Sequence, residues 1–298
     1  MRKRSNIILA IIFLSASVGL GLYANHIRST TEQRPARVSR AVEIEEGERF
    51  SRESNVSYKH LHVDYPVSID GRYEDHVELS GIAIASDMVH YNVRQDTLYI
   101  QYSDDHPVYR REPDSFAKKI GVVGKVAVTV HVGGVGLRSI TVGKRGSIRP
   151  TREEDGGFYR DPVYRDDEKE RYTLTFDTLD IVNGPVNIRL VGRVLNLTKI
   201  DDYTRFDLEG QAEHVNVNYD GGGSLNLNGY NLKCNTASVN TENNKSGTVI
   251  GNIQLSVQDT LLAKLYGTMN VLYQGDPEVI KYERSTGRVV HMFNPNAL

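Results

Sequence analysis

Apolar and polar residues alternate in a short phrase that recurs through the C-terminal half of the chain, between Val186 and Gly275. The copies end on Gly or Asp and read VNIRLVG, TRFDLEG, VNVNYDG, SLNLNG, IQLSVQD, LLAKLYG and MNVLYQG. A period of two is typical of a β-strand, and Gly and Asp accept the backbone conformations of tight turns. Because so short a strand cannot bury its apolar face alone, the pattern predicts copies stacked on one another as a β-solenoid.

The phrases recur about every nine to ten residues, so one coil with two main sheets would take about 18 to 20 residues. Asparagine recurs between the apolar positions, at Asn187, Asn196, Asn216, Asn218, Asn226, Asn228, Asn231, Asn235 and Asn240. Asn accepts the left-handed conformation at corners, and its amide can bond to the same position one coil away. We therefore expect a stacked parallel sheet with amide ladders.

Strand patterns begin earlier, at Val56, with KHLHVDYPVSIDG, HVELSGIAIA, DTLYIQY, KVAVTVHVGG and LRSITVGKRGSIR. Two charged stretches interrupt them, at 103–115 and 151–171, and each contains Pro-Val-Tyr-Arg. We interpret both stretches as excursions from the solenoid, whose shared residues arise by chance or by an old duplication; the alternative is a paired functional surface.

The amino terminus carries the clearest localisation signal. Arg2, Lys3 and Arg4 precede an uncharged run from Ile7 to Tyr23, and about 17 residues make roughly 26 Å of helix. The positive flank predicts a cytoplasmic start, an inner-membrane anchor and a C-terminal domain in the periplasm. The alternative is a cleaved signal that releases a periplasmic or secreted protein.

These patterns divide the chain into four parts. They are a transmembrane helix at 1–24, a polar linker at 25–55, a β-helix domain at 56–290 and a tail at 291–298. The linker is rich in Arg, Glu, Ser and Thr and shows no sustained period, as expected of a solvated segment.

Composition excludes some classes of function. The formal net charge is −2, so there is no basic field to recruit nucleic acid. Cys234 is the one cysteine, which excludes an intrachain disulfide and predicts a small buried core residue.

Tyrosine is enriched, with 17 residues, whereas the chain has no Trp. The absence of Trp disfavours a dedicated carbohydrate module. Most of the tyrosines are expected to lie half buried on sheet faces.

The segments LRSITVGKRGSI and LYGTMNVLYQGDPEVIKYERSTGRVV resemble the putative auto-transporter adhesin, head GIN domain family. The likeness spans about Val56 to Val290 and is most specific in a closing motif formed by Tyr273, Gly275, Pro277, Val279 to Tyr282, Gly287 and Arg288. It implies a right-handed single-stranded parallel β-helix, an adhesive or cell-surface role, and no established catalytic residue or cofactor. The chain departs from the family in its turns, where Glu-Gly, Asp-Gly-Gly-Gly and Asn-Gly replace Gly-Ser-Gly, and in its two charged stretches.

The sequence offers one candidate metal site. His60, His62 and Asp64 alternate on a predicted strand and so face one way, but same-face neighbours on one strand lie about 7 Å apart and usually diverge. We interpret them as outward polar residues and predict no metal ligand in the chain.

Candidate catalytic residues are equally sparse. A sugar-cleaving site would need Asp177 or Asp180 to converge with Asp201, Asp202 or Asp207 across coils. The chain has no nucleophile motif, and its Gly clusters, Gly133-Gly134-x-Gly136 and Gly221-Gly222-Gly223, are interpreted as turns. We predict no catalytic residue.

The end of the solenoid is predicted from Pro277, whose missing N–H would stop another in-register strand. The following residues would form a strand pair or cap, with candidate inner positions Val279, Ile280, Val289, Val290 and Phe293.

The sequence therefore predicts a non-enzymatic exported β-helix that binds an envelope protein or a glycan. The alternatives are a polysaccharide-active enzyme and a structural or sensory partner of an envelope signalling system.

Overall fold

The computed structural model describes residues 49–82, 86–103, 128–150, 171–200, 203–241 and 250–292. The chain divides into two units, residues 1–44 with 114–123 and residues 45–113 with 124–298, and every described residue belongs to the second. The predicted anchor at 1–24, the linker up to residue 48, both Pro-Val-Tyr-Arg copies and Phe293 lie outside the described residues. Within the described ranges, no helix is long and apolar enough to span a membrane.

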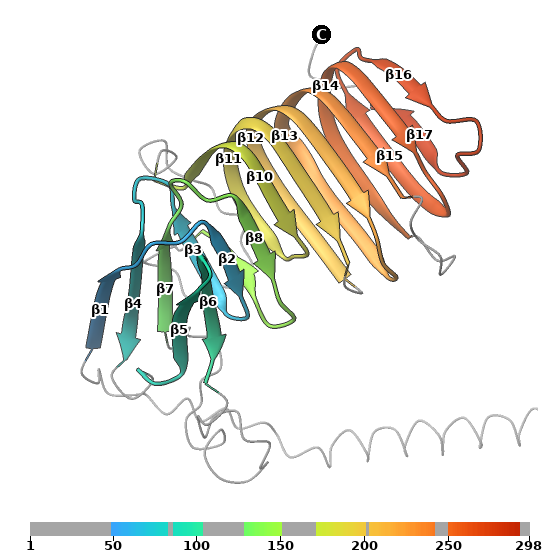
Figure 1. Ribbon diagram of the computed structural model, residues 1–298. Helices are drawn as coiled ribbons and strands as arrows, with labels where there is room; N and C mark the ends of the chain where they lie inside the picture. The colour runs from blue at the N-terminus through green and yellow to red at the C-terminus, as the bar shows by residue number, and fades with distance from the viewer. Residues whose placement is uncertain are drawn as a thin grey trace, which may run out of the picture. The chain divides into compact units, whose positions relative to one another are not determined.

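The described residues form strands and loops without a helix, which confirms the all-β prediction (Figure 1). The strands are β1 Arg49–Asn55, β2 His60–Val63, β3 Pro66–Asp70, β4 His76–Ile82, β5 Val89–Arg94, β6 Thr97–Tyr102, β7 Val128–Gly133, β8 Ser139–Val142, β9 Ser147–Ile148, β10 Thr173–Val182, β11 Val186–Lys199, β12 Tyr203–Tyr219, β13 Ser224–Asn240, β14 Ile250–Lys264, β15 Thr268–Gln274, β16 Glu278–Lys281 and β17 Arg288–His291.

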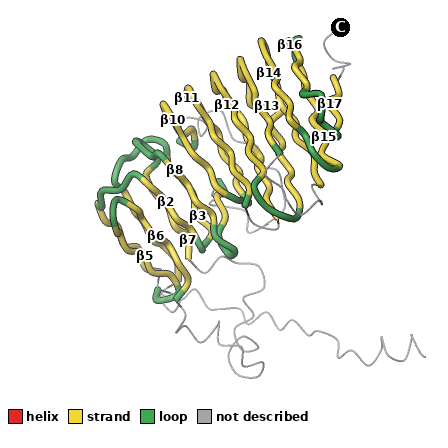
Figure 2. The backbone as a smooth tube through the Cα atoms, turned by 45° about the vertical axis from the view of Figure 1, so that its right-hand side comes forward, coloured by secondary structure: helices red, strands yellow, loops and turns green. Residues whose placement is uncertain are grey.

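Strands β10 to β15 pair in parallel, each with the next strand in the chain. Figure 2 shows β10 to β14 lying side by side. The offset between partners varies, from 16 residues where Thr173 lies beside Arg189 to 26 where Ser224 lies beside Ile250. The predicted coil of 18 to 20 residues is therefore an average, because insertions at the turns lengthen individual coils.

Two phrases of the sequence share β12 and two share β14, and β12 and β13 are each 17 residues long. These strands are longer than usual, and each bends partway along its length. The register with the neighbouring strand shifts at the bend. Gly210 lies at such a place with a φ of 113°, and a Cβ there would lie 2.0 Å from the carbonyl oxygen of Leu190. Only Gly fits this position.

Alternation along each strand places every second residue in a common core. One inward row stacks a residue from each of five successive strands: Leu179, Leu195, Val215, Ala237 and Leu261. All five are at most 2% exposed. Burial of this apolar surface is the main force that holds each coil on the next.

The N-terminal strands correct the expectation of a wholly parallel β-helix. β1 with β4, β4 with β7, and β5 with β6 are antiparallel, so the strands form a mixed, curled arrangement. β5 and β6 form a hairpin because Gln95 and Asp96, with φ values of 48° and 60°, make a two-residue turn of the type that suits the twist of paired strands. β1 also shortens the predicted linker, because residues 49–55 form a strand.

Parallel pairing nevertheless crosses both halves of the described chain. Among these residues, nine strands run parallel in the neighbour order β6, β2, β8, β10, β11, β12, β13, β14, β16. We call this set the nine-strand sheet.

The prediction that Pro277 ends the parallel stacking is wrong. β16 continues it beside β14, with Glu278 opposite Thr260, and β17 continues beside β15. Pro277 precedes the first paired residue, so its missing N–H falls outside the ladder. Val289 packs against the core, whereas Val279, Ile280 and Val290 are 36%, 43% and 43% exposed. Ile280 and Val290 thus face solvent, whereas Val279 continues the inward row beside Leu261 on the last strand of the stack.

Candidate functional site

The outward face of the nine-strand sheet carries a continuous row of mostly polar side chains, which we call the central row. In neighbour order it consists of Thr97, His60, Ser139, Asp180, Asn196, Asn216, Ser238, Leu262 and Ile280. The adjacent inward row is buried from Leu98 through Ala263, so alternation alone turns the central row outward.

Side-chain hydrogen bonds link neighbours along the central row. The Nδ2 atom of Asn216 donates to Oδ1 of Asn196 at 2.8 Å, and Nδ2 of Asn196 donates to Oδ1 of Asp180 at 2.7 Å. The amide donors therefore point toward the Asp180 carboxylate, which polarises the chain of bonds. At the other end of this chain of bonds, the side-chain oxygen Oδ1 of Asn216 remains an acceptor. The next residue of the row there is Ser238. The bond between Asn216 and Asn196 confirms the predicted amide ladder. A second ladder joins Nδ2 of Asn270 to Oδ1 of Asn252 at 3.1 Å.

A shallow hollow lies where β11 to β14 cross the central row. It holds about 400 Å³ and is lined by Val194, His214, Asn216, Thr236, Ala237, Ser238, Thr260 and Leu262. Nδ1 of His214 lies 2.7 Å from Oγ1 of Thr236, one strand away. None of the described residues that line the hollow is Asp, Glu, Lys or Arg. The hollow therefore offers hydroxyl, amide and imidazole groups beside the apolar side chains of Val194, Ala237 and Leu262.

His60 and Ser139 resemble part of a hydrolase site, because Nδ1 of His60 lies 2.7 Å from Oγ of Ser139. Catalysis would also need a group that orients the imidazole and donors for a developing oxyanion. Asp180, the next residue of the row, is instead engaged by Asn196. We interpret the contact as one link of the central row.

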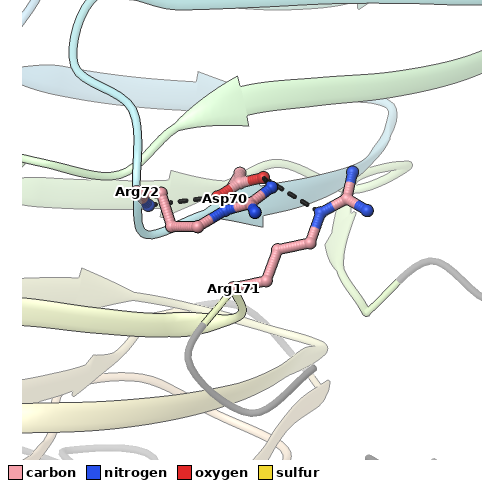
Figure 3. Close-up of polar contacts among 3 residues, drawn as sticks. All are labelled: Asp70, Arg72 and Arg171. Carbon is pink, nitrogen blue, oxygen red and sulfur yellow. Dashed lines mark hydrogen bonds and ion pairs between the residues drawn. The ribbon is translucent and has the colours of Figure 1, made fainter. Parts of the chain in front are cut away.

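A charge cluster built around a buried carboxylate lies elsewhere, at the end of β3 (Figure 3). The carboxylate of Asp70, which is 2% exposed, accepts hydrogen bonds from Nε and Nη2 of Arg72 at 3.1 and 2.9 Å and from Nε of Arg171 at 3.0 Å. Burial alone would raise the pKa of Asp70, but the bonds and charges of the two guanidinium groups lower this pKa below its usual value. Because the Asp70 carboxylate binds both guanidinium groups, this cluster fastens Arg171 to β3.

The structure does not gather the candidate metal ligands. His60, His62 and Asp64 face one way as predicted, yet His60 bonds to Ser139, while Nε2 of His62 lies 3.5 Å from Asp64 and its ring packs on Tyr99. No group of three potential ligands is found within the described ranges.

The candidate catalytic carboxylates also lie apart. Asp177 forms a bidentate pair with Arg193, whereas Asp207 lies opposite Asn187, six residues earlier on β11, and binds Arg205. Six residues of strand span about 20 Å, beyond the separation of about 5 to 10 Å that sugar hydrolysis requires. Asp180 lies further still, opposite Asn196. Asp201 and Asp202 fall outside the described residues.

Cys234 is buried as predicted, and its Sγ donates to the carbonyl oxygen of Ser256 at 3.4 Å. Burial raises the pKa of its thiol to about 12. The Gly clusters form turns as predicted, with positive φ at Gly136 and Gly223.

Sequence reasoning missed Ser139, His214 and Thr236 as members of one face. Alternation marks each as outward, but nothing local shows which residues become neighbours one coil away. The signal that would have found them is the in-register alignment of successive phrases.

Comparisons with known proteins agree with this architecture. The model of the family described as putative auto-transporter adhesin, head GIN domain, matches residues 60–277. The chain is similar to the crystal structure of a putative adhesin from Bacteroides fragilis, with 15% identity, a TM-score of 0.58 and coverage of 82% of this chain and 97% of the other. A putative adhesin from Parabacteroides merdae gives 12% identity, a TM-score of 0.51 and coverage of 83% and 97%. No curated protein matches the chain.

Proposed function

We propose that this chain, which belongs to the putative auto-transporter adhesin, head GIN domain family, is a non-enzymatic exported module that binds a partner on its nine-strand sheet. The partner is an envelope protein or a glycan, and nucleic acid is disfavoured by the net charge of −2.

The observation that carries the proposal is the run of side chains along the outward face. Seven polar residues in register, from Thr97 to Ser238, are presented on a backbone whose inward side is fully packed. A rigid scaffold fixes the spacing of such groups before a ligand arrives, which lowers the entropic cost of binding.

The expected right-handed, single-stranded parallel β-helix is part of this proposal for β10 to β17. The parallel pairing of successive strands supports it. The charged and apolar pattern of residues 1–24 supports an inner-membrane anchor with the domain in the periplasm. Release by signal cleavage is the alternative.

An enzyme that cleaves polysaccharides fits less well. Asp177 and Asp207 each bind an Arg, and their positions on the strands separate them by more than a catalytic pair requires. The side chains of the central row are arranged for hydrogen bonding rather than for proton transfer.

The test is binding of the full-length protein to envelopes isolated from the native host. Ser238→Arg places a long cationic side chain in the hollow and is expected to weaken binding at least tenfold. Asn228→Arg is the matched control, because Asn228 is an exposed residue of the same strand, ten positions earlier and outside the hollow. Equal thermal stability of the two variants would show that both fold. Unchanged binding by Ser238→Arg, or no binding by the unmodified protein, contradicts the proposal.

A further inference from the structure

The size of the hollow indicates the scale of its ligand. Its volume of about 400 Å³ lies within the range of small-molecule sites, roughly 300 to 1,000 Å³. A stable protein interface takes about 20 to 30 residues on each side, whereas eight residues line the hollow. The hollow thus suits a short stretch of a narrow polymer better than a protein surface.

The lining groups indicate the chemistry of that ligand. Thr236, Ser238 and Thr260 bring hydroxyl groups that both donate and accept, and Asn216 presents an acceptor at the end of the polarised amide chain. A charged ligand would exchange water for a lining whose described residues include no Asp, Glu, Lys or Arg to pair with its charge, which is unfavourable. A neutral ligand rich in hydroxyl groups meets no such cost and can satisfy each of these donors and acceptors.

Apolar side chains complete the fit. Val194 lies on the first strand of the hollow and Leu262 on the fourth, so apolar surface lies at both ends of the polar lining. A sugar ring presents C–H groups on its faces and hydroxyl groups at its edge, and this lining has partners for both, with aliphatic side chains in place of the Trp that the chain lacks.

The spacing of the strands sets a direction. Neighbouring strands lie about 4.8 Å apart, so equivalent side chains in the register row Val194, His214, Thr236 and Thr260 recur at that interval. This interval is close to the repeat of pyranose units in an extended chain. A glycan that crosses the strands at right angles would therefore place one unit over each strand.

From these observations we propose that the hollow binds a short stretch of a linear neutral glycan, laid across β11 to β14. The inference rests on the proposed binding function and names the ligand class of the same face. His214 takes part through Nε2, because its Nδ1 is engaged by Thr236. Asn196 and Asp180 act as positioning residues that orient the Asn216 amide.

The experiment probes the full-length protein with an array of linear oligosaccharides, neutral and anionic. Binding is expected to neutral members only. Asn216→Ala and Thr236→Val should each weaken this binding roughly five- to tenfold, as expected for loss of a hydrogen bond. Asn252→Ala is the matched control, since it removes an amide from another ladder, eight residues before Thr260 on β14, and should leave the affinity unchanged. Thermal unfolding of each variant checks that the fold persists.

Several results would overturn the inference. Binding to anionic members alone, no binding to any oligosaccharide, or an equal loss with Asn252→Ala would each do so. If envelope binding depends on Ser238 but no oligosaccharide binds, or if protease treatment of the envelopes abolishes binding, the glycan assignment fails while the binding function stands. If envelopes are not bound either, both fail.

Discussion

The carboxylate of Asp70 accepts a hydrogen bond from Nε of Arg171, a residue 101 positions later in the chain. Arg72 binds the same carboxylate through two side-chain nitrogens, and its backbone N–H donates to Oδ1 at 3.0 Å. The backbone N–H of Gly71 donates to the carbonyl oxygen of Arg171, so side chain and main chain hold the same junction. The start of the segment that leads into β10 is thereby fixed to the end of β3.

Replacing Asp70 tests the energetic weight of this junction. Asp70→Asn keeps the shape but removes the charge, and we expect a loss of about 3 kcal/mol in the free energy of unfolding, because a buried pair loses one partner. Urea denaturation measures it. Asp177→Asn is the control: its pair with Arg193 is just as short, at 2.7 Å, but its side chain is 75% exposed, so no measurable loss is expected. Equal effects of the two changes would contradict this account.

The same carboxylate predicts a dependence on pH. Its pKa is lower in the folded protein than the value of about 3.9 in an unfolded chain, so below that pH the unfolded state binds more protons. The stabilisation by Asp70 is complete above about pH 5 and is lost as the pH falls through the folded pKa. The difference in stability between the native protein and Asp70→Asn should therefore begin to shrink near pH 4 and shrink further as the pH falls. A constant difference down to pH 3 would show that Asp70 is not the titrating group.

Gly210 tests the close approach between β11 and β12. In Gly210→Ala, the new Cβ would meet the carbonyl oxygen of Leu190 at 2.0 Å and the residue would keep a φ of 113°. We expect a loss of about 2 kcal/mol or more in the free energy of unfolding. Gly136→Ala separates the two causes, because Gly136 also has a positive φ, 79°, but its nearest atom is the end of the Lys59 side chain at 3.4 Å. A loss of about 1 kcal/mol is expected there. A larger loss at Gly136 than at Gly210 would refute the steric explanation.

The thiol of Cys234 should be inert in the folded protein. It is buried, and its pKa of about 12 leaves almost no thiolate at pH 8. An aromatic disulfide reagent should therefore react at pH 8 only in step with unfolding, and in full once denaturant is added. Rapid stoichiometric reaction under native conditions would mean that the strands around Cys234 open.

Periodicity predicted the strands and their inward faces well, because alternation is a local property of the chain. Val215 and Leu225 are buried where the phrases place them, and the Asn196–Asn216 ladder follows from equivalent register positions on neighbouring strands. The hairpin between β5 and β6 was missed because its turn is Gln95-Asp96, a pair without the usual Asn-Gly or Asp-Gly signal. The prediction from Pro277 is wrong because the energetic cost of a proline depends on whether it lies inside or just before the paired residues.

The candidate site was harder to predict than the strands. His60 and Ser139 are separated by 79 residues, and their contact depends on which strand becomes the neighbour of β2. Which strand becomes that neighbour depends on the lengths of the intervening segments and on core packing. The alternation of apolar and polar residues contains no information on either. The Asp70 cluster was missed for the same reason, since Arg171 reads locally as part of a charged stretch.

The most direct test of the binding face is site-specific photo-cross-linking in intact cells of the native host. A photoreactive residue is introduced at Ser238, in the hollow, and in a second variant at Asn228, on the same strand but outside the hollow. The two variants report contacts at matched positions. The account predicts a cross-linked species from position 238 that is absent from position 228 and is lost when Thr236→Val is added. Cross-links of equal yield from both positions, or from position 228 alone, would contradict a binding site at the hollow of the nine-strand sheet.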